Sequence, residues 1–175
     1  MRDIRVALWG FGAMGSGIGR MIASKEGIVI SGVCDHWDQL IGQEVYSYLG
    51  IDRGDREPVH ITGDIKEIVR KDLCDIVILA TDSFVAAQYD KIIFCLEEGV
   101  HIISTAEEMA WPWAQNQEMA DKIDALAKER QVAVLGTGIN PGFVLDYLIL
   151  AISGTCEHVN SISAARINDL APFGK

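Results

Sequence analysis

The sequence predicts an α/β fold with a doubly wound parallel sheet, and three observations point to it. Short apolar runs alternate with longer helix-like stretches along almost the whole chain. Some of these runs, such as residues 76–80, contain only apolar side chains, as expected for strands covered on both faces. The first run opens into a glycine-rich turn followed by a helical pattern. Such regular alternation of strands and helices is typical of a parallel sheet.

Each element can be placed by its residue pattern. The expected strands are residues 4–9, 28–34, 59–62, 75–80, 101–104 and 132–136. The expected helices are residues 14–24, 65–71, 84–97 and 116–129. The last helix has Met119, Ile123 and Leu126 at helical spacing, which predicts an apolar stripe on one face.

The composition excludes several classes of protein. Of the 175 residues, 49% are hydrophobic, which is enough to bury one full core. The net charge of −10 argues against nucleic acid or an anionic membrane as a partner. No window approaches the roughly 18 apolar residues of a membrane span, and the first residues do not resemble a signal peptide. We therefore expect a cytoplasmic protein.

The cysteines and histidines predict no metal site. Cys34, Cys74, Cys95 and Cys156 show neither a C-x-x-C pair nor Cys/His ligand spacing. Most of them lie in or beside apolar runs, so we expect reduced core thiols. No two of the four histidines have metal-ligand spacing.

The glycine-rich turn has the pattern G-x-G-x-x-G and consists of Gly10, Phe11, Gly12, Ala13, Met14 and Gly15. Each glycine has a separate task in such a turn. Gly10 permits the tight turn, Gly12 lets the backbone approach a pyrophosphate, and Gly15 lets the helix pack closely. The start of the helix offers free N–H groups and a positive dipole end to phosphates. A strand before the turn and a helix after it predict a Rossmann dinucleotide-binding site.

Asp35 supports this interpretation and suggests the cofactor. It ends the second expected strand and follows Gly15 by 20 residues, the spacing of a carboxylate that binds ribose hydroxyls. A carboxylate there repels the 2′-phosphate of NADP, and the next three residues include no arginine or lysine. We therefore expect NAD as the cofactor, with NADP possible. We expect residues 53–58 to form an exposed loop. The alternative is that Arg53 or Arg56 binds the 2′-phosphate of NADP.

The end of the chain predicts a second unit. An apolar helix is expected over residues 143–152, and residues 159–167 then alternate in the manner of a strand. One strand cannot bury a face alone. We expect a complete dinucleotide-binding domain in residues 1–153 and the truncated beginning of a substrate and dimerisation domain, of α+β type, in residues 154–175.

With these motifs, the chain resembles the 2,4-diaminopentanoate dehydrogenase family, within the wider dihydrodipicolinate reductase and diaminopimelate dehydrogenase-like group. The resemblance rests on segments spread along the chain: residues 9–15, 53–57, 80–84, 103–110, 136–142 and 172–174. The most specific are Thr-Ala-Glu-Glu-Met-Ala at 105–110 and Gly-Thr-Gly-Ile-Asn-Pro-Gly at 136–142. Members of the family continue well past Lys175.

The resemblance implies NAD(P)-dependent oxidative deamination of the C4 amine of 2,4-diaminopentanoate, a step of ornithine degradation, by a homodimer. The products are 2-amino-4-oxopentanoate and ammonia. The reacting amine must be neutral, the iminium needs nearby negative charge, and water must be activated. These demands call for carboxylates at the carboxyl ends of the strands, where open α/β sheets bind ligands.

The sequence places polar side chains at those strand ends. Glu107 or Glu108 is expected to hold the reacting amine or take its proton, with Asp82 and Asn140 positioning the substrate. From the same strand ends, the residues expected to border the cofactor are Ala80, Thr81 and Thr105.

Each of these acidic residues also has an alternative role that is structural rather than catalytic. Glu107 and Glu108 can be solvated acids at a helix start, and Asp82 can be a turn or N-cap acid. Trp111 and Trp113 are expected to pack a loop over the domain rather than stack on a substrate. Two alternative functions remain. The protein can be a related dehydrogenase or reductase of another amino acid, such as diaminopimelate, or an NAD(P)-binding module without turnover.

Overall fold

In the computed structural model, which describes residues 2–169, six parallel strands form one sheet in the order β3-β2-β1-β4-β5-β6. The strands are β1 (Ile4–Trp9), β2 (Ile28–Cys34), β3 (Ile61–Thr62), β4 (Ile76–Leu79), β5 (His101–Ser104) and β6 (Val134–Gly136). The strand order reverses between β1 and β4, so the crossovers on either side of this point run in opposite directions. The predicted doubly wound α/β fold is confirmed.

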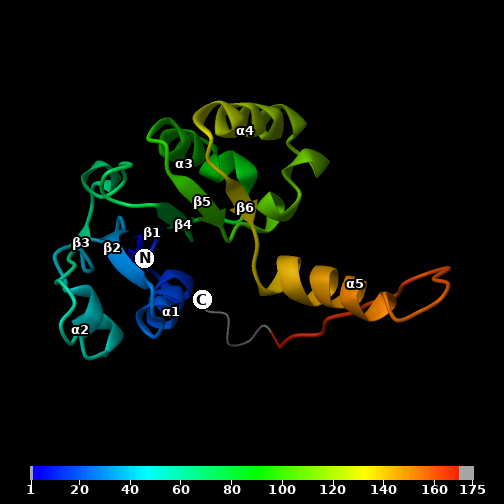
Figure 1. Cartoon of the computed structure of the whole chain (residues 1–175), viewed down its shortest axis with the longest axis horizontal. Coiled ribbons are helices and arrows are strands. Elements are labelled where there is room, and N and C mark those ends of the chain that lie inside the picture. The colour runs from blue at the N-terminus through cyan, green and yellow to red at the C-terminus, as the bar shows by residue number, and fades with distance from the viewer. Residues whose placement is uncertain (1, 170–175) are drawn as a thin grey trace.

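Helices cover both faces of the sheet (Figure 1). These covering helices are α1 (Ala13–Ala23), α2 (Val45–Leu49), α3 (Val85–Glu97) and α4 (Gln117–Arg130), and a fifth helix, α5 (Leu148–Ser153), follows near the end of the chain. Short 3₁₀ turns occur at η1 (Ile65–Glu67), η2 (Glu107–Ala110) and η3 (Pro112–Ala114). A wide helical segment, η4 (Ile139–Tyr147), leads into α5 and is interrupted at Asn140, Pro141 and Gly142, whose backbone is not helical.

Alternate residues of the central strands supply two separate cores. Val6 and Leu8 of β1 pack with α1 and α2, whereas Ala7 packs with α3 and α4. β4 divides in the same way, with Val77 and Leu79 on the α3 side and Ile78 on the α1 side. This explains why these strands read as continuous apolar runs, since both of their faces are buried.

Two predictions between β2 and β4 were wrong. Helix α2 was not expected; Glu44 caps it by accepting a hydrogen bond from the Ser47 N–H at 2.7 Å, and Gly50 ends it in the left-handed conformation. Conversely, residues 65–71 form only the 3₁₀ turn η1. The apolar residues there, such as Ile65 and Val69, are β-branched, which disfavours the helical backbone in so short a stretch.

The end of the chain also differs from the prediction. Residues 159–167 lie outside any strand, because no neighbouring strand in the described part of the chain offers hydrogen bonds. Pro172, Phe173 and Gly174, which belong to the resemblance, lie outside the described residues. In Figure 1, α5 extends away from the sheet. No helix among residues 2–169 is long and apolar enough to cross a membrane.

Candidate functional site

The carboxyl ends of β1, β2, β4, β5 and β6 meet along one edge of the sheet, because the strands are parallel. The turns that follow them contain every residue that the sequence analysis assigned to the site. This edge includes the switch point between β1 and β4, where α/β proteins bind their ligands.

The turn after β1 is shaped by two glycines whose neighbours leave no room for a side chain. Gly10 has a φ of 92°, and a Cβ there would lie 2.6 Å from the carbonyl oxygen of Ala80. A Cβ on Gly15 would lie 1.9 Å from the carbonyl oxygen of Gly10. At Gly12, by contrast, no atom lies within 4 Å of the place that a Cβ would take. The turn is therefore tight on its inner side and open at Gly12.

Helix α1 begins at this open position. Gly12 is its N-cap, no side chain caps the helix, and its first turn has no acidic residue. The first N–H groups of a helix have no partner within the helix, and they add to the positive end of its dipole. A backbone without Cβ atoms beside free amides fits the pyrophosphate of a dinucleotide.

Asp35 connects β2 to the glycine turn. Its side chain is almost completely buried, and its Oδ2 accepts a hydrogen bond from the Phe11 N–H at 2.5 Å. Its Oδ1 accepts one from the Trp37 N–H at 2.9 Å. A carboxylate has about four acceptor positions, so these bonds leave capacity for ribose hydroxyls. The sequence predicted the ribose role of Asp35 but not this bond to the turn.

Asp82 forms an ion pair with Lys91 of α3. The Lys91 ammonium lies 2.5 Å from Oδ2 of Asp82 and also donates to Oγ1 of Thr81 at 3.0 Å. The hydrogen bond from Lys91 is the main cause of the lowered pKa of Asp82, and a hydrogen bond from Thr81 lowers it further. Asp82 is therefore an ionised carboxylate that is paired with Lys91 in the turn after β4.

Glu107 and Glu108 begin the 3₁₀ turn η2, and they differ in how they are held. Oε2 of Glu108 accepts hydrogen bonds from the Val85 N–H at 2.9 Å and from Nδ2 of Asn116 at 3.1 Å. Glu107 is exposed and has no hydrogen bond or ion pair among the described residues. Glu108 is thus a fixed carboxylate, and Glu107 is free to move.

The position of η2 depends on Gly136 of β6. A Cβ at Gly136 would lie 1.9 Å from the carbonyl oxygen of Met109, so only glycine lets η2 rest directly on this strand. Thr105, just before η2, donates from its N–H and its Oγ1 to the carbonyl oxygen of Leu79. These contacts hold the carboxylate-bearing turn against the sheet edge.

Both glutamates line a pocket of about 380 Å³, which we call the acidic pocket. Its other polar lining includes Asn116 from the start of α4 and Asp146 from η4, and Pro141 also borders it. Asp82 does not line this pocket. Three carboxylates around one cavity favour a ligand with positive charge, such as an ammonium group. No group of His, Cys, Asp and Glu side chains in residues 2–169 is arranged to hold a metal ion.

Asn140 lies directly before the pocket residue Pro141, to which it is joined by a cis peptide bond. It is half-buried, and its side chain has no hydrogen bond among the described residues. Gly142 has a φ of 126°, and its N–H donates to Oδ2 of Asp146 at 2.7 Å. This loop therefore brings a free amide to the border of the pocket and orients Asp146.

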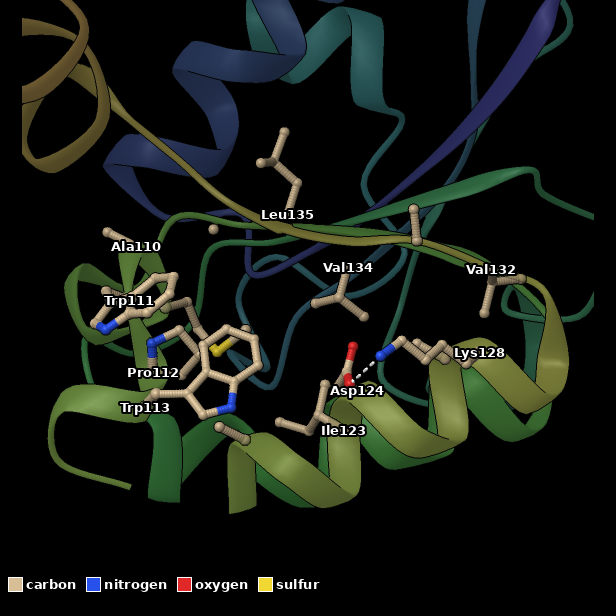
Figure 2. Close-up of a pocket in the computed structure, with 15 residues that line it drawn as sticks. Ala110, Trp111, Pro112, Trp113, Ile123, Asp124, Lys128, Val132, Val134 and Leu135 are labelled. Atoms are coloured by element: carbon tan, nitrogen blue, oxygen red, sulfur yellow. Dashed lines mark hydrogen bonds and ion pairs between the residues drawn. The ribbon is translucent and has the colours of Figure 1, made fainter. Parts of the chain in front are cut away.

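The two tryptophans after η2 line a second cavity, and Trp111 also borders the acidic pocket. Their ring centroids are 5.0 Å apart, and they border a pocket of about 390 Å³ between α4 and β6 (Figure 2). Trp113 also donates its indole N–H to Asp121 at 3.0 Å. Trp113 thereby ties η3 to α4, whereas the Trp111 side chain is largely exposed.

The loop that contains Arg53 and Arg56 lies at the opposite edge of the sheet. Arg56 donates to the carbonyl oxygen of Ala23 at 2.9 Å and stacks over the ring of Tyr46. Both arginines line a pocket with Arg5 and Val29, at the amino ends of β1 and β2. From there they do not reach Asp35, so the alternative of a 2′-phosphate contact is not supported.

Sequence reasoning missed three residues of the site: Lys91, Asn116 and Asp146. Lys91 reads as one of several surface charges on a helix, and only the fold brings it to Asp82. Asn116 precedes α4 and reads as a helix cap. No spacing signal in the sequence singled out Asp146, and its bond to the Gly142 N–H is visible only in the structure.

Comparison with known proteins agrees with this fold. Residues 4–136 match the family model "Dihydrodipicolinate reductase, N-terminus", and residues 143–175 match "2,4-diaminopentanoate dehydrogenase C-terminal domain". A 2,4-diaminopentanoate dehydrogenase of Acetoanaerobium sticklandii is 45% identical over 174 residues. This match covers 99% of the chain and 49% of the enzyme, so the chain spans about half the length of that curated relative.

Solved structures show the same architecture. An amine dehydrogenase from Mycobacterium smegmatis superimposes with a TM-score of 0.80 at 30% identity, over 90% of this chain and 46% of that one. GenD2 from gentamicin A biosynthesis, solved in complex with NAD, has a TM-score of 0.58 at 16% identity, over 78% of this chain and 34% of its own, and so shares the fold alone. The match over residues 4–136 shows that the chain belongs to the dihydrodipicolinate reductase N-terminal domain family, and its similarity to 2,4-diaminopentanoate dehydrogenase extends beyond that domain.

Proposed function

We propose that the protein containing this chain oxidises the C4 amine of 2,4-diaminopentanoate with NAD and releases 2-amino-4-oxopentanoate and ammonia. The observation that supports this most directly is the 45% identity to an enzyme of that name over nearly the whole chain. The acidic pocket at the carboxyl edge of the sheet supports it independently, since the substrate has two ammonium groups.

The cofactor cradle consists of the glycine turn from Gly10 to Gly15, with Phe11, Gly12, Ala13 and Met14 between them. Asp35 takes the adenosine ribose hydroxyls with its remaining acceptor positions, which favours NAD over NADP. Ala80, Thr81 and Thr105 border the cofactor from the neighbouring strand ends. When bound, the nicotinamide ring accepts a hydride from the substrate carbon.

The C4 ammonium group loses one proton to solvent in the acidic pocket, and Glu108 holds the resulting neutral amine with its free Oε1, because its Oε2 is anchored by Val85 and Asn116. A carboxylate held in this way stabilises the positive charge of the iminium without reorganising. Asn140, which directly precedes the pocket residue Pro141, positions the substrate. Glu107, which is free to move, accepts the proton of the water that attacks the iminium carbon.

For Asp82 we propose a role at the cofactor. Because it is paired with Lys91 and does not line the acidic pocket, it positions the adenosine half of the cofactor rather than the amine. Asp82 is thus a positioning residue for the cofactor, and the carboxylates of the acidic pocket bind the amine.

The test is an assay of NAD reduction by the full-length protein with a panel of diamino acids: 2,4-diaminopentanoate, meso-diaminopimelate, ornithine and lysine. We expect NADH to form fastest with 2,4-diaminopentanoate, with one ammonia released per NADH. Preference for diaminopimelate would replace the proposed substrate by the alternative one. Cofactor binding without oxidation of any diamino acid would indicate a binding module.

We further propose that the protein works as a cytoplasmic homodimer. Cys34, Cys74 and Cys95 are buried free thiols, which suits a reducing compartment. Apolar side chains along η4 and α5, including Phe143 and Leu150, are exposed here and suit a protein interface. Sedimentation of the full-length protein tests the dimer, and a monomer at micromolar concentration would contradict it.

A further inference from the structure

Gln88 of α3 is a polar residue at a core position. It is completely buried, in helical register with the buried Val85, Ile92 and Cys95, which face the sheet. An apolar side chain would fill this place equally well, and a buried amide is unfavourable unless its groups are bonded. The partners of Gln88 therefore indicate why the amide is there.

Its partners belong to the two turns that form the site. Nε2 of Gln88 donates to the backbone carbonyl of Asp82 at 3.0 Å. Its Oε1 accepts a hydrogen bond of 2.6 Å from the hydroxyl of Ser104, which is also completely buried. The Ser104 oxygen in turn accepts from the Ala106 N–H at 3.1 Å. A continuous chain of three hydrogen bonds thus joins the turn after β4 to the turn after β5.

The order of donors and acceptors in this chain allows one arrangement only. The Asp82 carbonyl can only accept and the Ala106 N–H can only donate. The amide of Gln88 must therefore direct its NH₂ to Asp82 and its oxygen to Ser104. A second link runs alongside, since the Glu108 N–H donates to the Ser83 carbonyl at 3.2 Å. The two turns are thereby held at a fixed separation.

We propose that Gln88, acting through Ser104, is a positioning residue that sets the distance between the cofactor-side turn at Asp82 and the carboxylates at Glu107 and Glu108. The kinetic part of this inference rests on the proposed function. Displacing reacting groups by about 1 Å can lower a rate by roughly a hundredfold, so a buried link between these two turns is a means of controlling the rate.

The kinetic test compares Gln88→Met, of similar length without hydrogen-bonding groups, with wild type in the full-length enzyme. We expect kcat for amine oxidation to fall roughly tenfold or more, while KM for NAD stays within about threefold. Ser31→Ala is the matched control, because the Ser31 hydroxyl is buried without a partner and lies at the opposite edge of the sheet. A folded Gln88→Met enzyme with a wild-type kcat would overturn the proposal.

Amide hydrogen exchange tests the same link without catalysis. In Gln88→Met, the amides of Ala106 and Glu108 are expected to exchange roughly tenfold faster, and those of β1 to be unchanged. Uniformly faster exchange would mean that Gln88 only contributes stability and would refute the positioning role. If Gln88→Met does not fold, Ser104→Ala is used instead. It keeps the bond from Gln88 to Asp82 but removes the two bonds of the Ser104 hydroxyl, to Gln88 and to Ala106, and is expected to show the same local pattern.

The two tests separate the two failures. If wild type oxidises no diamino acid, the proposed function is wrong, and the exchange experiment still decides whether Gln88 holds the turns together. If wild type is active and neither kcat nor local exchange responds to the variants, the inference about Gln88 is wrong and the proposed function stands.

Discussion

The Val85 N–H donates a hydrogen bond of 2.9 Å to Oε2 of Glu108, which places a carboxylate at the N-terminus of α3. The favourable interaction of a negative charge with the start of a helix helps to hold Glu108 in one orientation. Glu107, its neighbour in the sequence, has no such partner among residues 2–169. Two adjacent and chemically identical residues thus have different environments, because only Glu108 accepts hydrogen bonds from the Val85 N–H and from Asn116.

The first prediction concerns this pair. Glu108→Gln keeps the shape of the side chain but removes its charge, so it is expected to lower kcat of the full-length enzyme roughly a hundredfold or more. Glu107→Gln is expected to lower kcat by about tenfold, because water activation is its only task. Steady-state NADH formation measures both. A wild-type rate in both variants would remove the two carboxylates from the mechanism.

The glycine turn offers a matched pair in one helix. A Cβ on Gly15 would overlap the Gly10 carbonyl, whereas nothing lies within 4 Å of a Cβ on Gly17. Gly15→Ala is therefore expected to destabilise the protein by roughly 1–3 kcal/mol. Since that substitution also opens the cradle, it should weaken NAD binding by about tenfold or more. Gly17→Ala should instead stabilise the helix by roughly 0.5–1 kcal/mol.

Urea unfolding and calorimetric titration with NAD check these two variants. Unchanged NAD affinity in Gly15→Ala would show that the turn does not form the cofactor cradle. Gly17→Ala controls for the general effect of adding a methyl group to α1.

Cofactor preference is expected to depend on the ion pair between Asp82 and Lys91. Asp82→Asn removes a negative charge near His36 and frees the Lys91 ammonium for a phosphate. NADP binding is then expected to improve relative to NAD by about fivefold, the effect of one partly exposed charge pair. The double variant Asp82→Asn/Lys91→Met should return the ratio toward that of wild type. If the ratio of the NADP and NAD dissociation constants is the same in Asp82→Asn as in wild type, the ribose 2′-hydroxyl does not lie beside the Asp82–Lys91 pair.

Acid stability is expected to depend on Asp75. Its carboxylate accepts hydrogen bonds from the backbone and guanidinium of Arg5 and from Arg2. These bonds, those of Arg5 first, hold the pKa of Asp75 well below its usual range. Because the folded-state pKa is lowered, the stabilisation is complete above the unfolded-state pKa of about 4 and is lost as the pH falls below it.

Asp75→Asn is therefore expected to lower the free energy of unfolding by roughly 1–3 kcal/mol at pH 7 and by progressively less below about pH 4. Urea unfolding between pH 7 and pH 3 measures the difference. Asp72→Asn serves as the control, since Asp72 is mostly exposed in its pair with Arg70 and should have little effect. A difference between Asp75→Asn and wild type that stays constant over this range would contradict the assignment.

Local sequence patterns were sufficient to predict a helix or strand where that element is long and the burial of its residues follows a regular pattern. β1, β2, α1 and α3 form within a residue or two of their predicted bounds, because burial on both faces of a parallel sheet leaves a clear apolar signature. Short elements gave no such signature. α2 depends on a cap at Glu44 and a left-handed Gly50, and residues 65–71 lack the length to form a helix.

The order of residues along this chain determined the sheet, the glycine turn and the acid at its ribose position, because these depend on periodicity and on spacings of at most about 20 residues. Only the tertiary structure decided that Lys91 neutralises Asp82, that Asn116 and Asp146 join the glutamates at one pocket, and that Gln88 links two turns. Those relationships join residues on different strands and helices, and distance along the chain does not reveal which side chains the fold brings together.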